Sequence, residues 1–462
     1  MAQRRARRPG GRRRQGTACR WDPMQTYLVG GAVRDRLLQL EVKDRDYVVV
    51  GSDPAEMLSL GFRQVGRGFP VFLHPRSGAE YALARTERKA GHGYGGFICD
   101  FSRSVTLRDD LMRRDLTINA IAEDADGHLI DPCHGVDDLH QRLLRHISPA
   151  FAEDPLRVLR VARFAARFHA LGFTVASETM DLLRDMSHSG ELEWLTPERV
   201  WGELHKALCT ANPEVFIVIL HQVGALRRVL PWIEDLFGVP APARWHPEID
   251  TGVHTLMTLA RAAEECTDPA IRFAMLCHDL GKALTPREQW PHHRDHNRLG
   301  LQPLQDMCRR LRVPGAYADL AAMVVLYHND IHHLYREGAA GVVGLLERLD
   351  AFRRPQRARA YALCCRCDFL GRRGFEARPY PRTDYLLAIH SLCRGVRASE
   401  FTARGLTGAA LGERIRARRI ELTQEFMQQL PRSELDDSAY AQPPADAGLP
   451  AASHLARPQA AE

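Results

Sequence analysis

The chain of 462 residues contains no run of 18 apolar residues, although 45% of its residues are hydrophobic. The sequence therefore predicts no membrane-spanning helix. Residues 1–23 also lack the apolar segment of a secretory signal. The scattered cysteines show no disulfide framework, and the group Cys364, Cys365 and Cys367 is more typical of a helical core than of a metal site. These absences favour a cytoplasmic protein with reduced thiols.

Acidic residues are absent from residues 1–20, which hold eight arginines and contribute +8 to a net charge of +6. The rest of the chain therefore carries about −2, and the overall charge gives no indication of a nucleic-acid partner. Residues 1–24 are predicted to be a disordered Arg-rich extension. Only local clusters of charge can indicate a ligand.

The pattern of apolar residues predicts an α+β protein of several domains. Short β-rich runs dominate the first part of the chain, and helical periodicity follows from about residue 150. The predicted parts are a disordered extension (1–24), an α+β head (25–145), a helical neck and body (146–238), a histidine-rich helical domain (239–352), a helical C-terminal region (353–435) and a disordered tail (436–462).

Two aspartates follow a Gly-Gly turn in the stretch YLVGGAVRDRLLQLEVKDRDYVVVG, residues 27–51. In a strand, Asp44 and Asp46 point to the same face and repel each other unless a cation lies between them. Mg²⁺ with substrate phosphates meets this need. Gly31 would let the backbone approach a phosphate, and Arg34 would hold it. The alternative is a solvated strand with alternating charges, but the nearby Gly-Gly turn and arginine favour phosphoryl transfer.

Two arginine clusters offer further anion contacts. In LMRRDLTINA (111–120), Arg114 suits a triphosphate or a ribose. In EDPLRVLRVARFAARF (153–168), four arginines fall within an arc of about 120° of a helix, which is either a solvated face or an anion-binding face. Asp154 and Arg157 together offer an acceptor and a donor fork, the groups needed to bind the edge of a nucleobase.

Histidines are concentrated in residues 245–333, where AMLCHDLGKA contains an adjacent pair, His278 and Asp279. Neutral imidazole and carboxylate are ligands for divalent transition metals. His254, 24 residues upstream, is expected on a neighbouring helix. A single histidine on an apolar face is usually structural, but this density around a His-Asp pair favours a metal centre.

The motifs GGAVRD, KDRD, RRDLTINA and EDPLR, in this order, resemble those of the bacterial class of CCA-adding enzymes (tRNA nucleotidyltransferases). These enzymes belong to the polymerase-β-like nucleotidyltransferase superfamily, and the resemblance covers residues 25–430. It implies a polymerase-β-like head in which Asp44 and Asp46 are catalytic and hold Mg²⁺. It further implies contacts to CTP or ATP from Gly31, Arg34, Arg114, Asp154, Arg157, Arg160 and Arg163.

The implied activity is the addition of CCA to the 3′ end of tRNA without a nucleic-acid template, with release of pyrophosphate. Asp154 and Arg157 would select C or A. The implied partners are tRNA, CTP and ATP, with no membrane, and the protein is expected to be a monomer or a homodimer. Gln39 replaces a glycine that is common in the family, but that position belongs to a helix end, so we expect activity to be retained.

The histidine pattern resembles the HD phosphohydrolase superfamily. CCA-adding enzymes with such a domain have phosphatase, 2′-nucleotidase and 2′,3′-cyclic phosphodiesterase activities, and Ni²⁺ is the metal implied for the phosphatase. The resemblance makes His278 and Asp279 catalytic. The expected ligands are His254, His278 and Asp279, with His328 and then His296 next. Asn329 stands where a carboxylate is the more usual neighbour, so the last ligand stays open.

Three rival functions share some of these features. A poly(A) polymerase has the same head motifs but usually lacks an HD domain. An HD phosphohydrolase with an RNA-binding head would not need the carboxylates and arginines that the head retains. A pure RNA-binding scaffold would need neither metal site. Arginines in residues 353–419 are either a tRNA contact or a solvated helical face.

Overall fold

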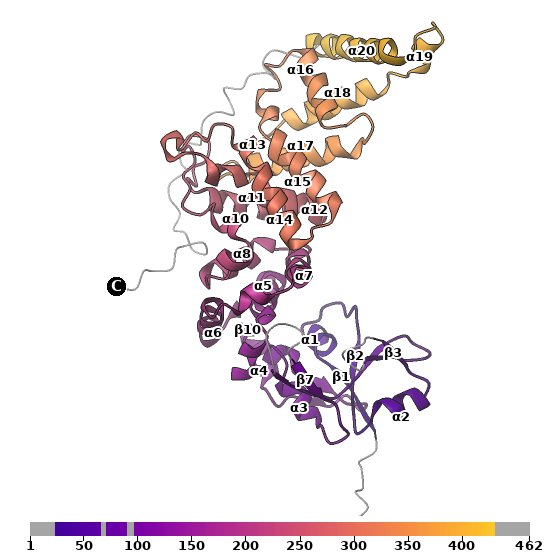
Figure 1. The fold of residues 1–462 in the computed structure, drawn as a ribbon, viewed down its shortest axis with the longest axis vertical. Coiled ribbons are helices and arrows are strands. Elements are labelled where there is room, and N and C mark those ends of the chain that lie inside the picture. The colour runs from indigo at the N-terminus through magenta and orange to yellow at the C-terminus, as the bar shows by residue number, and fades with distance from the viewer. Residues whose placement is uncertain (1–23, 66–70, 90–96, 430–462) are drawn as a thin grey trace, which may run out of the picture. The chain divides into compact units, whose positions relative to one another are not determined.

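The computed structural model describes residues 24–65, 71–89 and 97–429. The predictions of a disordered extension and a disordered tail lie outside these ranges, apart from Met24 at the boundary. The described chain forms two compact units, which meet in the sequence at residues 139 and 140. Each unit is described by itself; in Figure 1 the first unit runs from the indigo start of the described chain to the purple helix labelled α4.

A seven-stranded mixed sheet forms the centre of the first unit, in the strand order β3-β4-β5-β2-β1-β8-β9. The strands are β1 (Gln25–Val29), β2 (Asp46–Val50), β3 (Arg63–Val65), β4 (Val71–Leu73), β5 (Glu80–Leu83), β8 (Ala122–Glu123) and β9 (Leu129–Ile130). Strands β2 and β5 run parallel, whereas the other neighbours are antiparallel. A separate two-stranded sheet joins β6 (Thr86–Lys89) to β7 (Phe97–Asp100).

The apolar side chains of these strands build a core against short helices. Val49, Met57, Phe72 and Leu83 are all at most 2% exposed and pack together. The helices are α1 (Gly31–Leu37), α2 (Pro54–Ser59), α3 (Leu107–Met112), the 3-10 turn η2 (Thr117–Asn119) and α4 (Gly135–Gln141). Helix α3 begins at a capping box formed by Thr106 and Asp109, whose side chain and backbone bond reciprocally.

The turn after β1 places Asp46 close to the start of α1. Val29 pairs with Asp46 across the β1–β2 ladder, and Gly30 then turns the chain with φ +66°. A side chain at this glycine would be strained by the positive φ, and its Cβ would lie 2.7 Å from Nη1 of Arg114 and displace that guanidinium. Because β1 ends at Val29, no strand lies opposite Asp44. The expectation that both aspartates lie within a strand is therefore wrong for Asp44, which precedes β2.

The second unit is almost entirely helical, as predicted. Its first elements are β10 (Leu143–Leu144), η3 (Pro149–Glu153), α5 (Leu156–Phe168), η4 (His169–Leu171), β11 (Thr174–Val175), α6 (Ser177–His188), η5 (Glu191–Trp194), α7 (Pro197–Leu208), α8 (Pro213–Gln222), α9 (Leu226–Val229) and α10 (Pro231–Glu234). Apolar residues of α5 such as Val158, Val161 and Ala162 are fully buried, because this helix packs against α7 and α8.

The histidine-rich region follows in the same unit. Its elements, and those after it, are α11 (Thr251–Glu265), α12 (Pro269–Cys277), η6 (Leu280–Leu284), η7 (Arg287–Gln289), α13 (His296–Leu299), α14 (Leu301–Leu311), α15 (Gly315–Tyr327), η8 (Asp330–His333), α16 (Ala339–Arg348), α17 (Gln356–Leu370), α18 (Arg382–Arg394), α19 (Ser399–Thr402) and α20 (Gly408–Gln429). Helix α12 contacts α11, α15 and α17 (Figure 1). Among the described residues, no helix has the length and apolar character needed to cross a membrane.

The cysteine group at residues 364–367 lies on α17. Cys364, Cys365 and Cys367 are free thiols with no exposed surface. Burial raises the pKa of all three, which keeps them protonated and unreactive. The prediction of a helical core at this position is confirmed.

Candidate active sites

The first candidate site lies where β1, α1 and β2 meet. Asp44 and Asp46 are both exposed at the start of β2. Desolvation by surrounding protein atoms raises the pKa of Asp46, the guanidinium of Arg114 opposes this shift, and the negative charge of Asp44 adds to it. The charge of Asp44 therefore disfavours the charged form of Asp46, and a bound divalent cation would relieve this repulsion.

Arg34 is fixed beside this turn by hydrogen bonds inside the head. The residue is only 3% exposed on α1, and its Nε donates to Oδ1 of Asp35 over 2.9 Å. Its Nη1 donates to Oδ1 of Asn119. Asn119 in turn donates through Nδ2 to Oδ1 of Asp115 over 2.8 Å. The motif RRDLTINA thus orients Arg34, a role that its sequence alone did not reveal.

Arg114 is oriented by a buried carboxylate that the sequence predictions missed. Asp110 is fully buried and accepts from Nη2 of Arg113 over 2.6 Å and from Nη2 of Arg114 over 3.0 Å. Burial acts to raise the pKa of Asp110, but the two guanidinium groups outweigh it and lower that pKa. Arg114 also donates to the backbone oxygen of Asn119 over 3.3 Å. Asp110 lies on α3 and Arg114 follows the end of that helix, and their spacing of four residues is the signal that could have predicted this contact.

The second predicted group lies at the start of α5, in the other unit. The carboxylate of Asp154 accepts from Nη2 of Arg199 over 3.0 Å, which makes Arg199 a further candidate residue. Arg157 donates to the backbone oxygen of Ala150 over 3.2 Å. Asp154 and Arg157 were predicted to bind the edge of a nucleobase together. In the structure, the carboxylate of Asp154 is also held by Arg199, a third side chain, which comes from α7.

The arginines along α5 differ in their surroundings. Arg163 is 9% exposed and forms an ion pair with Glu203 of α7, whereas Arg167 is exposed. Arg160 is partly buried, with its guanidinium 5.7 Å from the ring centre of Phe164. Arg163 thus links two helices, and its predicted contact with a nucleotide stays a prediction.

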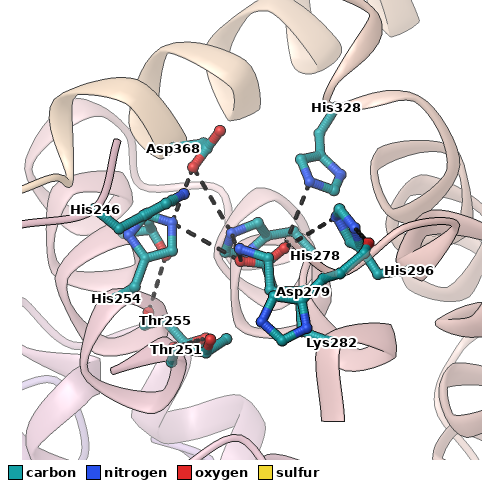
Figure 2. Close-up of polar contacts among 12 residues, drawn as sticks. His246, Thr251, His254, Thr255, His278, Asp279, Lys282, His296, His328 and Asp368 are labelled. Carbon is teal, nitrogen blue, oxygen red and sulfur yellow. Dashed lines mark hydrogen bonds and ion pairs between the residues drawn. The ribbon is translucent and has the colours of Figure 1, made fainter. Parts of the chain in front are cut away.

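The histidine-rich region forms a second candidate site, a buried centre built from three helices. His254 comes from α11, His278 and Asp279 follow α12, and Asp368 comes from α17. All four are at most 2% exposed. Nε2 of His254 lies 3.0 Å from Oδ1 of Asp368, and Nε2 of His278 lies 3.2 Å from Oδ2 of Asp279 (Figure 2).

Backbone carbonyls set the orientation of three histidine rings. Nδ1 of His278 lies 2.7 Å from the oxygen of Met275, and Nδ1 of His328 lies 3.0 Å from that of Val324. Nδ1 of His296 contacts the backbone oxygen of the residue three positions before it, over 2.7 Å. A carbonyl can only accept, so in each ring Nδ1 is the donating nitrogen and Nε2 is the nitrogen that faces the centre.

The donor atoms at the centre fit a divalent metal. Nε2 of His278 and both oxygens of Asp279 are buried, and within the described residues their close polar contacts are ion pairs, such as that of Oδ2 with Nζ of Lys282 over 2.7 Å. These atoms have capacity left for a bound cation, because buried polar atoms are normally fully bonded. Two imidazoles and carboxylates in a buried cluster are the ligand types that transition metals take.

Asp279 is shared between two groups of possible ligands. Its Oδ1 lies 3.6 Å from Nε2 of both His296 and His328, whereas Oδ2 faces His254 and His278 (Figure 2). The donor atoms of each group of three, His254 with His278 and Asp279, and His296 with His328 and Asp279, lie within 4.8 Å of one another. The predicted ligand His328 therefore lies on the second side of Asp279.

Asn329 does not take the place of a ligating carboxylate. Its Nδ2 contacts Nε2 of His296 over 3.1 Å and donates to Oδ1 of Asn297 over 3.0 Å. It thus acts as a donor beside the second group. The carboxylate that completes the first group is Asp368, which the sequence predictions missed because it lies beyond the predicted domain boundary at residue 352.

Two basic side chains hold the carboxylates ionised. Nζ of Lys282 lies 2.7 Å from Oδ2 of Asp279, and Nη2 of Arg372 lies 2.9 Å from Oδ2 of Asp368. Burial acts to raise the pKa of both aspartates, but these cations and the neighbouring histidines lower it well below the ordinary value. The carboxylates are therefore negatively charged at neutral pH and ready to bind a cation.

Gly281 allows the two groups to approach each other. A Cβ at this position would lie 1.9 Å from the backbone oxygen of His296 and 2.5 Å from the backbone nitrogen of Gly300. No side chain can be accommodated at such distances. The glycine of the HDLGK sequence thus brings the α13 backbone, and with it His296, against η6.

Three family models match the chain. Residues 26–145 match the poly A polymerase head domain, residues 172–237 match the probable RNA and SrmB-binding site of polymerase A, and residues 251–370 match the HD domain. The HD match includes Asp368. Both kinds of catalytic domain use divalent metal ions.

Several solved structures share the fold. The Bacillus stearothermophilus CCA-adding enzyme in complex with CTP has 22% identity and a TM-score of 0.59, covering 89% of this chain and 94% of that one. A CCA-adding enzyme in complex with ATP has 20% identity and a TM-score of 0.58, covering 89% and 88%. The Thermotoga maritima CCA-adding enzyme complexed with tRNA has 20% identity and a TM-score of 0.57, covering 89% and 90%.

The fold and the matched domains define the class of the protein. The chain contains, one after another, matches to a poly A polymerase head domain, to an RNA-binding region of polymerase A and to an HD domain. Its fold is shared with the CCA-adding enzymes named above. The predicted resemblance and the α+β fold class are confirmed.

Proposed function

We propose that the chain adds CCA to the 3′ end of tRNA, using CTP and ATP. The observation that carries this proposal is the position of Asp46, which pairs with Val29 next to the Gly30 turn, close to the guanidinium of Arg114. The carboxylate of Asp46 can bind a metal ion, the backbone at Gly30 can approach a phosphate, and the guanidinium of Arg114 can pair with phosphate oxygens. Together they suit a nucleoside triphosphate with its metal ion.

In the proposed reaction, the 3′-hydroxyl of tRNA attacks the α-phosphorus of CTP twice and then that of ATP. Each step forms one O–P bond and releases pyrophosphate. Asp44 and Asp46 would hold Mg²⁺, which supplies neutralisation of the phosphate charge when bound. Arg34 and Arg114 would bind the triphosphate oxygens, in positions already fixed by Asn119 and Asp110.

Side chains at the start of α5 and just before it would choose the base. Asp154 would accept from the amino group of C or A, and Arg157 would donate to a ring nitrogen or carbonyl. Each good bidentate pair discriminates between bases by about 1–3 kcal/mol. Arg199 would hold the carboxylate of Asp154 in place, since it already contacts that group. Gly31, Arg160 and Arg163 remain proposed nucleotide contacts.

We further propose that the HD centre hydrolyses phosphate esters, including 2′,3′-cyclic phosphates and 2′-nucleotides. The supporting observation is the convergence of buried donor atoms from His254, His278 and Asp279, which lie within 4.8 Å of one another. His254, His278, Asp279 and Asp368 would hold the metal, with His296 and His328 on the second side of Asp279; Ni²⁺ is the metal we propose for the phosphatase. Lys282, 2.7 Å from Asp279, would place a positive charge beside the phosphate.

Paired substitutions test the head. Asp44→Asn with Asp46→Asn should abolish incorporation of labelled CTP and ATP into tRNA that lacks its CCA end. Asp124→Asn with Asp126→Asn removes an equally spaced pair from the turn after β8 and should leave incorporation unchanged. Unchanged incorporation in the Asp44 and Asp46 variant would refute the site.

The HD centre is tested in the same preparations. Asp279→Asn should abolish release of phosphate from p-nitrophenyl phosphate and opening of 2′,3′-cyclic AMP in the presence of Ni²⁺, Co²⁺, Mn²⁺ or Mg²⁺. Nucleotide incorporation should persist and shows that the variant is folded. Hydrolysis at the wild-type rate would exclude Asp279 as part of the centre.

A further inference from the structure

Glu248 lies in the loop before α11, next to the HD centre, and the proposed metal site gives it no role. Its side chain has no exposed surface, and Oε1 lies 2.8 Å from Nδ1 of His254 and 3.1 Å from Nδ1 of His246. Its Oε2 accepts from the backbone nitrogen of Arg373 over 3.3 Å. The carboxylate of Glu248 is thus buried against Nδ1 of His254, the ring nitrogen that faces away from the centre.

His254 differs from the other histidines of the centre in what faces its Nδ1. His278, His296 and His328 each direct Nδ1 to a backbone carbonyl. For His254 the facing group is the carboxylate of Glu248. A carboxylate on the outer nitrogen fixes the tautomer, holds the plane of the ring and makes the inner nitrogen a stronger donor to a metal. That inner nitrogen, Nε2, is the one that lies 3.0 Å from Asp368.

The backbone next to Glu248 is strained. Ile249 has φ +64°, a conformation that a β-branched residue rarely adopts, and its side chain is 51% exposed. The nitrogen of Asp250 bonds to the oxygen of Glu248 over 2.8 Å, which closes a γ-turn around Ile249. Such strain persists only where the surrounding contacts over-determine it, and it concentrates at functional sites.

The two neighbours of Ile249 show what the strained turn achieves. Asp250 caps α11 by accepting from the nitrogen of Val253 over 3.0 Å, so its direction is set by the helix. The tight turn reverses the chain within one residue and directs Glu248 inward. If the only requirement were to start α11, an extended residue before the cap would serve without strain.

We propose that Glu248 is a positioning residue of the HD centre, which holds His254 in the tautomer and orientation that present Nε2 as a metal ligand. This inference rests on the proposed metal centre. It adds a residue that does not touch the metal and acts only through His254.

The chain offers a matched control for this contact. Oε2 of Glu234 lies 2.8 Å from Nδ1 of His221, a carboxylate–imidazole contact of the same length between partly exposed side chains, and neither residue belongs to the centre. Glu234→Gln should therefore change metal binding by less than twofold. Glu248→Gln keeps the size of the side chain and removes its charge, whereas Glu248→Ala removes the contact.

The experiment titrates metal-free full-length protein with Co²⁺ and follows the visible absorption of the bound ion. We expect Glu248→Gln to weaken binding by about 10-fold and Glu248→Ala by up to about 100-fold, with an altered spectrum, because outer-shell partners of ligating histidines have effects of this size. Nucleotide incorporation should be retained in all variants and reports on folding. If Glu248→Ala does not fold, Glu248→Gln decides the question.

Two results would overturn different claims. Wild-type affinity and spectrum in a folded Glu248→Gln variant would refute the positioning role and leave the metal centre in place. Failure of the wild-type protein to bind Co²⁺, Ni²⁺ or Mn²⁺ would refute the proposed centre itself, and the positioning role with it.

Discussion

His254 and Asp368 lie 3.0 Å apart although 114 positions separate them in the sequence. Their contact exists because α11 and α17 pack against each other in the second unit. The same packing brings both residues to His278 and Asp279 at the end of α12. The geometry of the centre therefore depends on helix packing as much as on the His-Asp pair itself.

Asp368 should be required for metal binding. Asp368→Asn keeps the shape of the side chain but removes its charge, and it also leaves Arg372 without its ion pair. We expect metal affinity to fall by about 100-fold or more, beyond what loss of an outer-shell partner causes. Isothermal titration with Ni²⁺ or Co²⁺ measures it. The control is Asp330→Asn, next but one to His328, because Asp330 is half-exposed and pairs with Arg348 over 2.9 Å. Equal loss in both variants would contradict the assignment.

Gly281→Ala should distort the centre by displacing α13. The added methyl group would lie 1.9 Å from the backbone oxygen of His296, so the two backbones must separate. We expect a loss of about 1–3 kcal/mol of stability, measured by denaturant unfolding, together with weaker metal binding. Gly344→Ala is the matched control, since a Cβ there would meet only Nη1 of Arg348 at 3.6 Å. Stability equal to that of the control would show that the contact relaxes without cost.

Gln39→Gly should stabilise the head. Gln39 has φ +57° after α1, and its nitrogen bonds to the oxygen of Arg36 over 2.9 Å, as at a helix end that favours glycine. The expected gain is about 0.5–1 kcal/mol, seen as a higher denaturant midpoint. Gln39→Ala, which keeps the Cβ, should give no gain. Equal gains in stability for the two variants would mean that the side-chain amide of Gln39, rather than its positive φ, destabilises the wild-type head.

Asp110 should make the stability of the head depend on pH. Its pKa is lowered from 3.8, so its contribution is present above that value and disappears as the pH falls through the lowered pKa of the folded state. Asp110→Asn should cost about 3 kcal/mol at pH 7 because Arg113 and Arg114 lose their common partner. The difference from wild type should shrink towards pH 2 in urea unfolding. The exposed Asp137→Asn should cost little at any pH, and a pH-independent difference for Asp110→Asn would contradict this account.

The local motifs allowed much of the head and half of the HD centre to be predicted. The turn at Gly30, the arginine on α1 and the His278–Asp279 pair are each encoded within a few residues of sequence. The interpretation of Gln39 as a helix end also agrees with its positive φ. The domain boundaries, the roles of the site residues, the oligomeric state and the cytoplasmic location stay predictions.

The missed residues act through contacts between distant segments. Asp368 stands on α17 beside buried cysteines, but its partners His254 and His332 come from α11 and η8. Glu248 falls in the proline-rich stretch of residues 239–250, which shows no helical periodicity, and its side chain is fully buried. Asp110 differs from the exposed Asp109 only through the packing of α3, which sequence periodicity does not resolve at such a short helix.

The central claim is most directly tested by nucleotide addition with each triphosphate separately. The substrate is tRNA that ends at the nucleotide before CCA, and the products are resolved at single-nucleotide length. The account predicts that CTP alone adds two residues, that ATP adds one residue only after these two, and that UTP and GTP add none. Long adenylate tails formed from ATP alone would contradict it and identify a poly(A) polymerase instead.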